Sequence, residues 1–163
     1  IKNVMIAGNA FEVLKDIVIF HGLKDDELSF LLDFFDIRRY EEQEYIYKEN
    51  DMGKEMFVIL EGKIEILKKG KYGVLHSLVN LGKNELFGEM SFIDMQKRSA
   101  TVRAKIPTIV ATLSNMDLYG IYKLRIDIYV KILMNIAREL SRRLRKTDIE
   151  MLEFFPEDNF REH

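Results

Sequence analysis

The sequence has 163 residues and contains no cysteine, no tryptophan, two prolines and three histidines. Without cysteine it can form no disulfide, no thiolate nucleophile and no cysteine-based zinc site. His21, His76 and His163 are far apart and lack the spacing of metal ligands. The sequence also has no nucleophile elbow and no phosphate loop of the Walker type. We therefore predict that the chain binds no metal and is not an enzyme.

The sequence also lacks a strong charge of either sign and any long hydrophobic run. The net charge of −2 gives no general attraction to nucleic acid. No apolar run approaches the roughly 20 residues that span a bilayer, and the N-terminal residues lack the pattern of a signal peptide. We predict a cytoplasmic protein with no membrane span and no nucleic-acid contact.

The order of the periodic segments is helices, then strands, then helices. Residues 9–35 have helical spacing, with a second helix starting near Asp25 or Asp26. From Ile37 the period changes to that of strands, which we expect at residues 56–60, 64–68, 74–79, 101–106 and 109–113. This order predicts a mainly β, α+β fold: an antiparallel β-roll or jelly roll with N-terminal helices and a long C-terminal helix.

We expect a single domain over residues 1–163, with the β-roll at about 37–114 and a C-terminal helical lid at about 115–155. Ser114 or Asn115 begins the lid with a short helix. A longer helix follows, and its apolar stripe is Tyr129, Leu133, Ile136, Leu140 and Leu144.

One segment inside the β region carries recognisable chemistry. Gly88 allows the backbone to approach a ligand closely, and a short helix from Glu89 to Asp94 would present free N–H groups that favour an anion. Arg98 can bind two phosphate oxygens at once, and Ser99 adds a hydroxyl donor. Glu89 would bind a sugar hydroxyl and repel a second phosphate charge. The segment therefore predicts a site for a sugar ligand that carries one negative charge.

The sequence FGE, a short helix and then RSATV resembles the phosphate-binding cassette of cyclic nucleotide-binding domains. This family includes the bacterial catabolite activator proteins and the regulatory subunits of protein kinase A. The resemblance covers roughly residues 18 to 146, and Gly53, Gly62 and Gly82 stand where the turns of the family's β-roll carry glycine. The same fold and reversible nucleotide binding are what the resemblance implies.

Some positions depart from the family pattern. Gln43, Asn50 and the pair Lys83-Asn84 replace residues that are usually glycine or Pro-Gly. Asparagine tolerates a left-handed backbone, so we expect Asn50 and Asn84 to keep their turns. At Gln43 we expect a different local turn. Lys97 stands where proline commonly precedes the arginine.

The resemblance also implies a role for each cassette residue. Glu89 would accept a hydrogen bond from the ribose 2′-hydroxyl, and Arg98 with Ser99 would bind the cyclic phosphate. Main-chain N–H groups would add donors, and apolar side chains would wall the pocket. One arginine of the last helix, Arg143 or Arg142, would stack on the purine unless this charged face is merely solvated or docks an acidic partner. The complete predicted set is Phe87, Gly88, Glu89, Met90, Ser91, Arg98, Ser99, Ala100, Val102 and Arg143.

The predicted function is a regulatory sensor that binds cAMP in preference to cGMP, on the identity of Ser99, and relays occupancy through the C-terminal helix. The alternatives are an interaction or scaffold module whose pocket binds no nucleotide, and the sensor fragment of a larger transcription regulator. A homodimer through the C-terminal helix is expected, with Leu133, Leu140 and Leu144 as its seam. The sequence does not identify the output protein.

Overall fold

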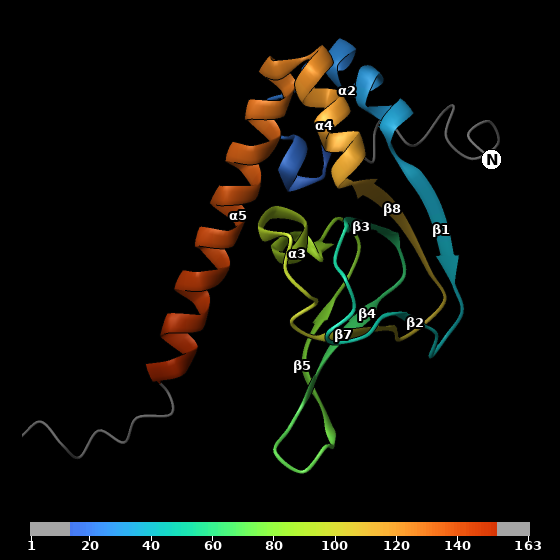
Figure 1. Cartoon of the computed structure of the whole chain (residues 1–163), viewed down its shortest axis with the longest axis vertical. Helices are drawn as coiled ribbons and strands as arrows, with labels where there is room; N and C mark the ends of the chain where they lie inside the picture. Colours follow the sequence, from blue (N-terminus) through green and yellow to red (C-terminus); the bar gives the residue numbers. More distant parts are fainter. Residues whose placement is uncertain (1–13, 153–163) are drawn as a thin grey trace, which may run out of the picture.

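The computed structural model describes residues 14–152, and two four-stranded antiparallel sheets form its β-roll (Figure 1). The first sheet has the order β1-β8-β3-β6 and the second the order β2-β7-β4-β5. The strands are β1 (Asp36–Tyr40), β2 (Tyr45–Tyr47), β3 (Glu55–Glu61), β4 (Ile64–Lys69), β5 (Leu75–Leu81), β6 (Leu86–Phe87), β7 (Thr101–Ala104) and β8 (Thr108–Ser114). The predicted fold class is confirmed; β1, β2 and β6 had no predicted counterpart of their own.

Helical segments lie before, within and after the roll. They are η1 (Val18–Phe20), α2 (Asp25–Leu31), η2 (Leu32–Phe34), α3 (Glu89–Asp94), α4 (Asn115–Leu124) and α5 (Ile126–Leu152). Helix α5 runs down one side of the molecule, past α4 and α3 (Figure 1). Ser114 caps α4, because its side chain accepts a hydrogen bond from the main-chain N–H of Asp117 at 3.1 Å.

The prediction of a first helix that runs to Gly22 was wrong for residues 16–21, although Leu14 and Lys15 are helical. Most of this stretch is turn and 3₁₀ structure, and residues 9–13 lie outside the described range. The physical reason is burial: Ile17, Ile19 and Phe20 are all almost completely buried, so the segment packs on more than one side and has no solvent-facing helical stripe. Gly22, at φ 80°, then turns the chain toward α2.

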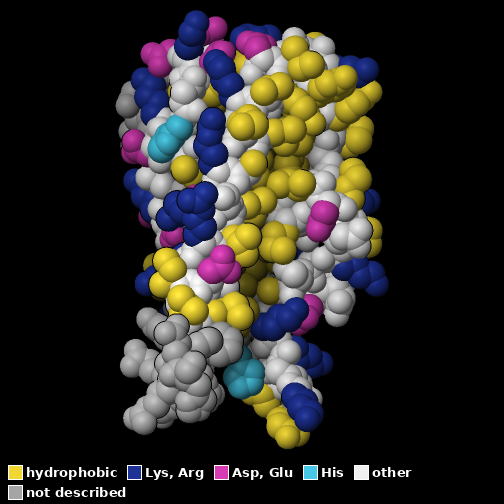
Figure 2. Space-filling model, turned by 90° about the vertical axis from the view of Figure 1, so that its left-hand side faces the viewer, with side chains coloured by type: hydrophobic (Ala, Val, Ile, Leu, Met, Phe, Trp, Pro, Cys, Tyr) yellow, Lys and Arg dark blue, Asp and Glu magenta, His cyan; other side chains and the backbone are white. Residues whose placement is uncertain are grey.

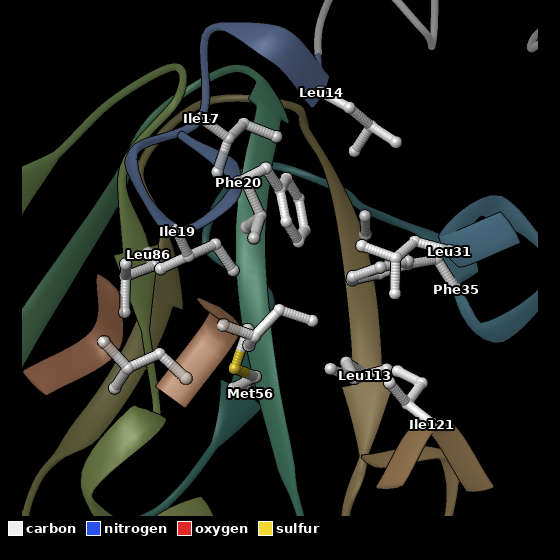
Figure 3. Close-up of a cluster of buried hydrophobic side chains, with 14 of the residues drawn as sticks. Leu14, Ile17, Ile19, Phe20, Leu31, Phe35, Met56, Leu86, Leu113 and Ile121 are labelled. Atoms are coloured by element: carbon white, nitrogen blue, oxygen red, sulfur yellow. The ribbon is translucent and has the colours of Figure 1, made fainter. Parts of the chain in front are cut away.

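The larger hydrophobic core joins this N-terminal segment to the first sheet and to α5. Figure 3 shows Ile17, Phe20, Met56 and Leu113, from segments far apart in the sequence, gathered in one cluster. A second cluster fills the roll itself and includes Phe57, Ile64, Phe87 and Val102. The helices and the roll are therefore packed as one body, with α5 fixed against the roll through the first cluster.

The buried face of α5 is shifted by about one residue from the predicted stripe. Ile128, Ile132 and Ile136 are fully buried, and the polar residues Asn135 and Glu139 are buried on the same face. Asn135 explains part of the shift, because its amide nitrogen donates to the carbonyl oxygens of residues 19 and 21 at 2.9 and 2.8 Å. These bonds select the helix face that a count of apolar residues alone does not find.

The structure leaves only part of the predicted dimer seam on the surface of α5. Leu140 packs against the protein's own core, and Leu133 is half-buried, whereas Leu144 is exposed. The exposed apolar residues of α5 include Val130 and Met134. Figure 2 shows hydrophobic side chains forming a band on the face of the molecule along which α5 runs.

Gln43 keeps the turn that we expected it to alter. Its φ is 67°, and Asn50 and Asn84 have φ values of 72° and 68°. The main-chain N–H of Gln43 donates to the carbonyl of Ala104 at 2.8 Å, which holds the turn closed between the sheets. Tertiary hydrogen bonding thus imposes a left-handed backbone on a residue that disfavours it.

Among residues 14–152, no helix combines the length and hydrophobicity that crossing a bilayer requires.

Candidate functional site

Gly88 forms the corner at which β6 passes into α3. Its φ is 76°, in the left-handed region that favours glycine. A Cβ at this position would lie 2.7 Å from Nη1 of Arg98 and 3.3 Å from the carbonyl oxygen of Glu55. The corner therefore requires glycine both for its backbone conformation and for the close approach of the arginine. Helix α3 has the bounds that the sequence predicts, Glu89–Asp94.

Arg98 reaches under this corner and is 4% exposed. Nη1 donates to the carbonyl of Gly88 at 2.9 Å, and Nη2 donates to the carbonyl of Glu55 at 2.7 Å. The guanidinium lies 4.1 Å from the ring centroid of Tyr47, a cation–π distance. Nε is buried and has no hydrogen-bond partner. The side chain is thus held in place while one of its donors is left free.

No carboxylate contacts the guanidinium of Arg98 directly. In the described part of the chain no salt bridge joins it to a carboxylate, and its bonded partners are main-chain carbonyls. Burial lowers the pKa of Arg98, and the nearby Tyr47 and Glu55 oppose that shift. A buried cation with no anionic partner attracts an anionic ligand, and guanidinium suits phosphate.

Glu89 and Arg143 meet across the same site from α3 and α5. Glu89 is 5% exposed, and Nη1 of Arg143 donates to its Oε1 at 3.1 Å. Nη2 of Arg143 donates to the carbonyl of Leu86 at 2.7 Å, and Nε donates to Oε1 of Glu139 at 2.8 Å. Burial raises the pKa of Glu89, and the charge of Arg143 partly offsets that rise. The arginine is held by three partners in this structure and does not lie free for stacking.

The predicted residues surround one small cavity of about 70 Å³. All of the predicted set except Val102 line it, together with Tyr47 and Ile66. Val102 is fully buried in the core of the roll, and Met90 is about half exposed at the rim. Ser91 is buried and its hydroxyl donates to the carbonyl of Lys97 at 3.3 Å. Small-molecule sites usually enclose about 300–1,000 Å³, so this cavity is too small for a nucleotide without movement.

Comparison of the sequence with known proteins gives a match to a family model. Residues 37–124, more than half of the chain, match the model described as "Cyclic nucleotide-binding domain". The chain belongs to the cyclic nucleotide-binding domain family. The match includes every β-strand of the roll from Ile37 onward and the whole cassette.

The curated relatives of this cyclic nucleotide-binding domain differ in the nucleotide that they are named for. The cyclic AMP receptor protein of Thermus thermophilus is 32% identical over 138 residues, covering 85% of this chain and 62% of the relative. A cGMP-dependent protein kinase of Plasmodium berghei is 30% identical over 153 residues, covering 92% of this chain and 16% of the kinase. The chain therefore spans less than two thirds of either relative.

A solved structure supports the fold independently. A cyclic nucleotide-binding domain from Methylobacillus flagellatus superimposes with a TM-score of 0.82, covering 94% of this chain and 90% of that one. The sequence identity is 23%, so this likeness concerns the fold alone. Because the superposition covers 94% of this chain, the likeness extends beyond the roll to the helices.

Three residues of the site were missed in the sequence. Tyr47 and Ile66 line the cavity from β2 and β4, and Glu139 binds Arg143 from one turn earlier on α5. The alternation of β4 pointed to Ile66 as an inward residue, but nothing in it linked that strand to the cassette. Glu139 had a usable signal, since acid and arginine stand four residues apart on a helix.

One further hollow lies near the cassette. A larger hollow of about 710 Å³ lies on another side of Arg98, between the turn before β3 and the start of α4. It is lined by Ile46, Tyr47, Asp51, Met52, Gly53, Lys54, Glu55, Phe57, Met95, Arg98, Ser114, Asn115 and Met116. Across residues 14–152, His, Asp and Glu form no cluster suited to a metal ion.

Proposed function

We propose that this domain is a regulatory sensor that binds a cyclic nucleotide reversibly and performs no chemistry on it. The observation that carries the proposal is Arg98, a buried guanidinium bonded to main-chain carbonyls and not to a carboxylate. A cyclic phosphate brings the single negative charge that this position lacks. Nε of Arg98 is also buried without a hydrogen-bond partner, so the guanidinium keeps an unused donor.

The proposed roles follow the cassette. Arg98 binds the cyclic phosphate, with the hydroxyl of Ser99 and the main-chain N–H groups of Gly88 and Ala100 as further donors. Glu89 accepts a hydrogen bond from the ribose 2′-hydroxyl. The exposed position of Ser99, at the edge of the cavity, supports its part in ligand contact.

We favour cAMP over cGMP. The resemblance associates alanine after the cassette arginine with cAMP and threonine with cGMP, because the threonine hydroxyl can reach the guanine amine. Ser99 has that hydroxyl, but serine also occurs at this position in cAMP binders. The named cyclic AMP receptor among the relatives supports the same choice, and the named cGMP-dependent kinase opposes it. Competition between the two nucleotides decides the point directly.

Occupancy is relayed through α5. Arg143 joins this helix to Glu89, and the cavity of about 70 Å³ requires the lid to move when a nucleotide enters. A ligand shifts the lid only as far as it binds one lid position better than the other, and each ~1.4 kcal/mol of difference is a factor of ten. The helix is the route by which the signal leaves the domain.

The relay fits a homodimer formed by the exposed face of α5. Val130, Met134, Ala137, Ser141 and Leu144 follow one another at alternating spacings of four and three, which is the coiled-coil repeat. Substituting Met134→Glu on this face is expected to halve the mass measured by analytical ultracentrifugation. A wild-type monomer at every accessible concentration rules the dimer out.

The absence of cysteine supports a cytoplasmic site of action.

Isothermal titration with cAMP and with cGMP tests the proposed function. We expect one site per chain and tighter binding of cAMP. A protein that gives no heat and no displaced fluorescent analogue with either nucleotide, at high concentration, refutes it.

The small cavity favours one second candidate. A cyclic nucleotide-binding domain whose pocket stays closed acts as an interaction module, with Arg143 acting as a permanent tie between α5 and the cassette. The same titration separates the two, because only the sensor binds cAMP; a melting experiment should then show added thermal stability with cAMP for the sensor alone.

A further inference from the structure

Glu139 holds two arginines of α5 with one buried carboxylate. It is 3% exposed and accepts hydrogen bonds from Nε and Nη2 of Arg142 at 2.9 and 2.8 Å. Its Oε1 also accepts from Nε of Arg143 at 2.8 Å. The hydrogen bonds from Arg142, with those from Arg143, hold the pKa of Glu139 below its usual range. Glu139 is therefore an ionised group placed directly behind the cassette.

The two arginines differ in what their remaining donors reach. The side chain of Arg142 is 70% exposed, whereas that of Arg143 is 28% exposed and extends to Glu89 and the carbonyl of Leu86. Because Nε of Arg143 is fixed on Glu139, the two terminal nitrogens point across the gap between α5 and the cassette. Glu139 thus determines where the charge of Arg143 lies.

The ionisation of Glu89 depends on the charge of Arg143. Glu89 is buried, and the charged or titratable groups that face it are Arg143 and Glu139 from α5, Arg98 from the cassette and Tyr47 from β2. Burial disfavours the ionised carboxyl, and a neighbouring cation restores it. Only the ionised form offers both oxygens as acceptors, one to Arg143 and one to a ligand hydroxyl.

We propose that Glu139 is a positioning residue of the nucleotide site: it holds Arg143 against Glu89, and Arg143 keeps Glu89 ionised to accept the ribose 2′-hydroxyl. This inference rests on the proposed function. The ligand class it implies is a cyclic nucleotide with a free 2′-hydroxyl, which the site distinguishes from its 2′-deoxy analogue.

The direction in which the pKa of Glu89 moves when Glu139 is removed distinguishes two roles of Glu139: holding Arg143 in place, or acting only as a nearby negative charge. Acting only as a nearby anion, Glu139 raises the pKa of Glu89, so its removal would lower that pKa. Acting as the holder of Arg143, its removal raises the pKa, because Glu89 loses the closest cation. At a pH well below the new pKa, each unit of rise weakens nucleotide binding tenfold, and at a pH well above it the loss disappears.

The test titrates cAMP and 2′-deoxy-cAMP into wild type, Glu139→Gln and Arg143→Gln from about pH 5 to about pH 8. Both variants are expected to bind cAMP about tenfold more weakly than wild type near pH 5 and within about threefold of it near pH 8. The preference for cAMP over the 2′-deoxy analogue shrinks in both variants near pH 5. Arg142→Gln is the matched control, because Arg142 binds the same carboxylate without reaching Glu89.

Glu89→Gln checks the titrating group, since it removes the ionisable carboxyl and should make binding independent of pH in the Glu139→Gln background. Wild-type binding with a pH profile and a 2′-hydroxyl preference unchanged in both variants overturns the inference and leaves the proposed function intact. Absence of wild-type binding overturns both. Circular dichroism verifies that each variant is folded. If Glu139→Gln unfolds, the test uses Arg143→Gln, which changes a partly exposed side chain.

Discussion

The cassette and α5 each send one arginine into the same cavity, and the protein compensates the two charges in opposite ways. Arg98 of the cassette is bonded to carbonyls and stacked on Tyr47. Arg143 of α5 lies between two carboxylates, those of Glu89 and Glu139. The first arginine has charge left for an anionic ligand, and the second is already neutralised. The difference fits our proposal that the cassette supplies the affinity and α5 supplies the control.

The largest expected effect is on Arg98. Arg98→Ala removes a buried, charged donor, and charge-assisted hydrogen bonds contribute about 1.5–3 kcal/mol, so we expect cAMP binding to weaken by about 100-fold. Isothermal titration measures the change. Lys97→Ala, which removes the adjacent exposed cation of the same loop, should change binding by less than about threefold. Equal losses in the two variants would mean that general charge, and not the buried guanidinium, attracts the nucleotide.

A smaller effect is expected at the corner that places Arg98. Gly88→Ala forces a left-handed backbone on alanine at about 1–2 kcal/mol and pushes a methyl group toward Nη1 of Arg98. We expect the free energy of unfolding to fall by about 2 kcal/mol and cAMP binding to weaken by about tenfold. Chemical denaturation and titration measure the two quantities.

Gly82→Ala is the matched control for that corner. An added Cβ at Gly82 meets no atom within 4 Å, and its φ is not positive. Its stability should change by less than about 0.5 kcal/mol. A Gly88→Ala protein as stable and as tight-binding as Gly82→Ala would show that the corner does not constrain the arginine.

The cassette was predicted from the sequence far better than α5, and the reason is physical. Gly88, α3 and Arg98 are contiguous, and local chemistry fixes their arrangement, so a pattern of residue types predicted the bounds of α3. The buried face of α5 depends on the tertiary hydrogen bonds of Asn135 and on the ion pairs that let Glu139 be buried, which no count of apolar residues weights. The helix prediction for the N-terminal segment failed for a related reason: the segment is buried on more than one side, so its apolar spacing does not mark one face of a helix.

The smallest expected effect concerns a turn away from the cavity. Gln43 has φ 67°, so Gln43→Gly relieves left-handed strain and, after the added flexibility of the unfolded chain, should raise the free energy of unfolding by about 0.5 kcal/mol. Glu42→Gly, at a neighbour without a positive φ, should lower it instead. Chemical denaturation with unchanged cAMP binding is the expected result. Destabilisation by Gln43→Gly would mean that the glutamine side chain, and not the strain, determines this turn.

A crystal structure of the protein with cAMP tests the central claim most directly. We expect the cyclic phosphate within hydrogen-bond distance of the guanidinium of Arg98, the ribose 2′-hydroxyl on Glu89, and α5 displaced to enlarge the cavity while Arg143 stays bonded to Glu89. A nucleotide seated in the larger hollow beside the start of α4, with its phosphate away from Arg98 and the cassette cavity unchanged, would contradict the account.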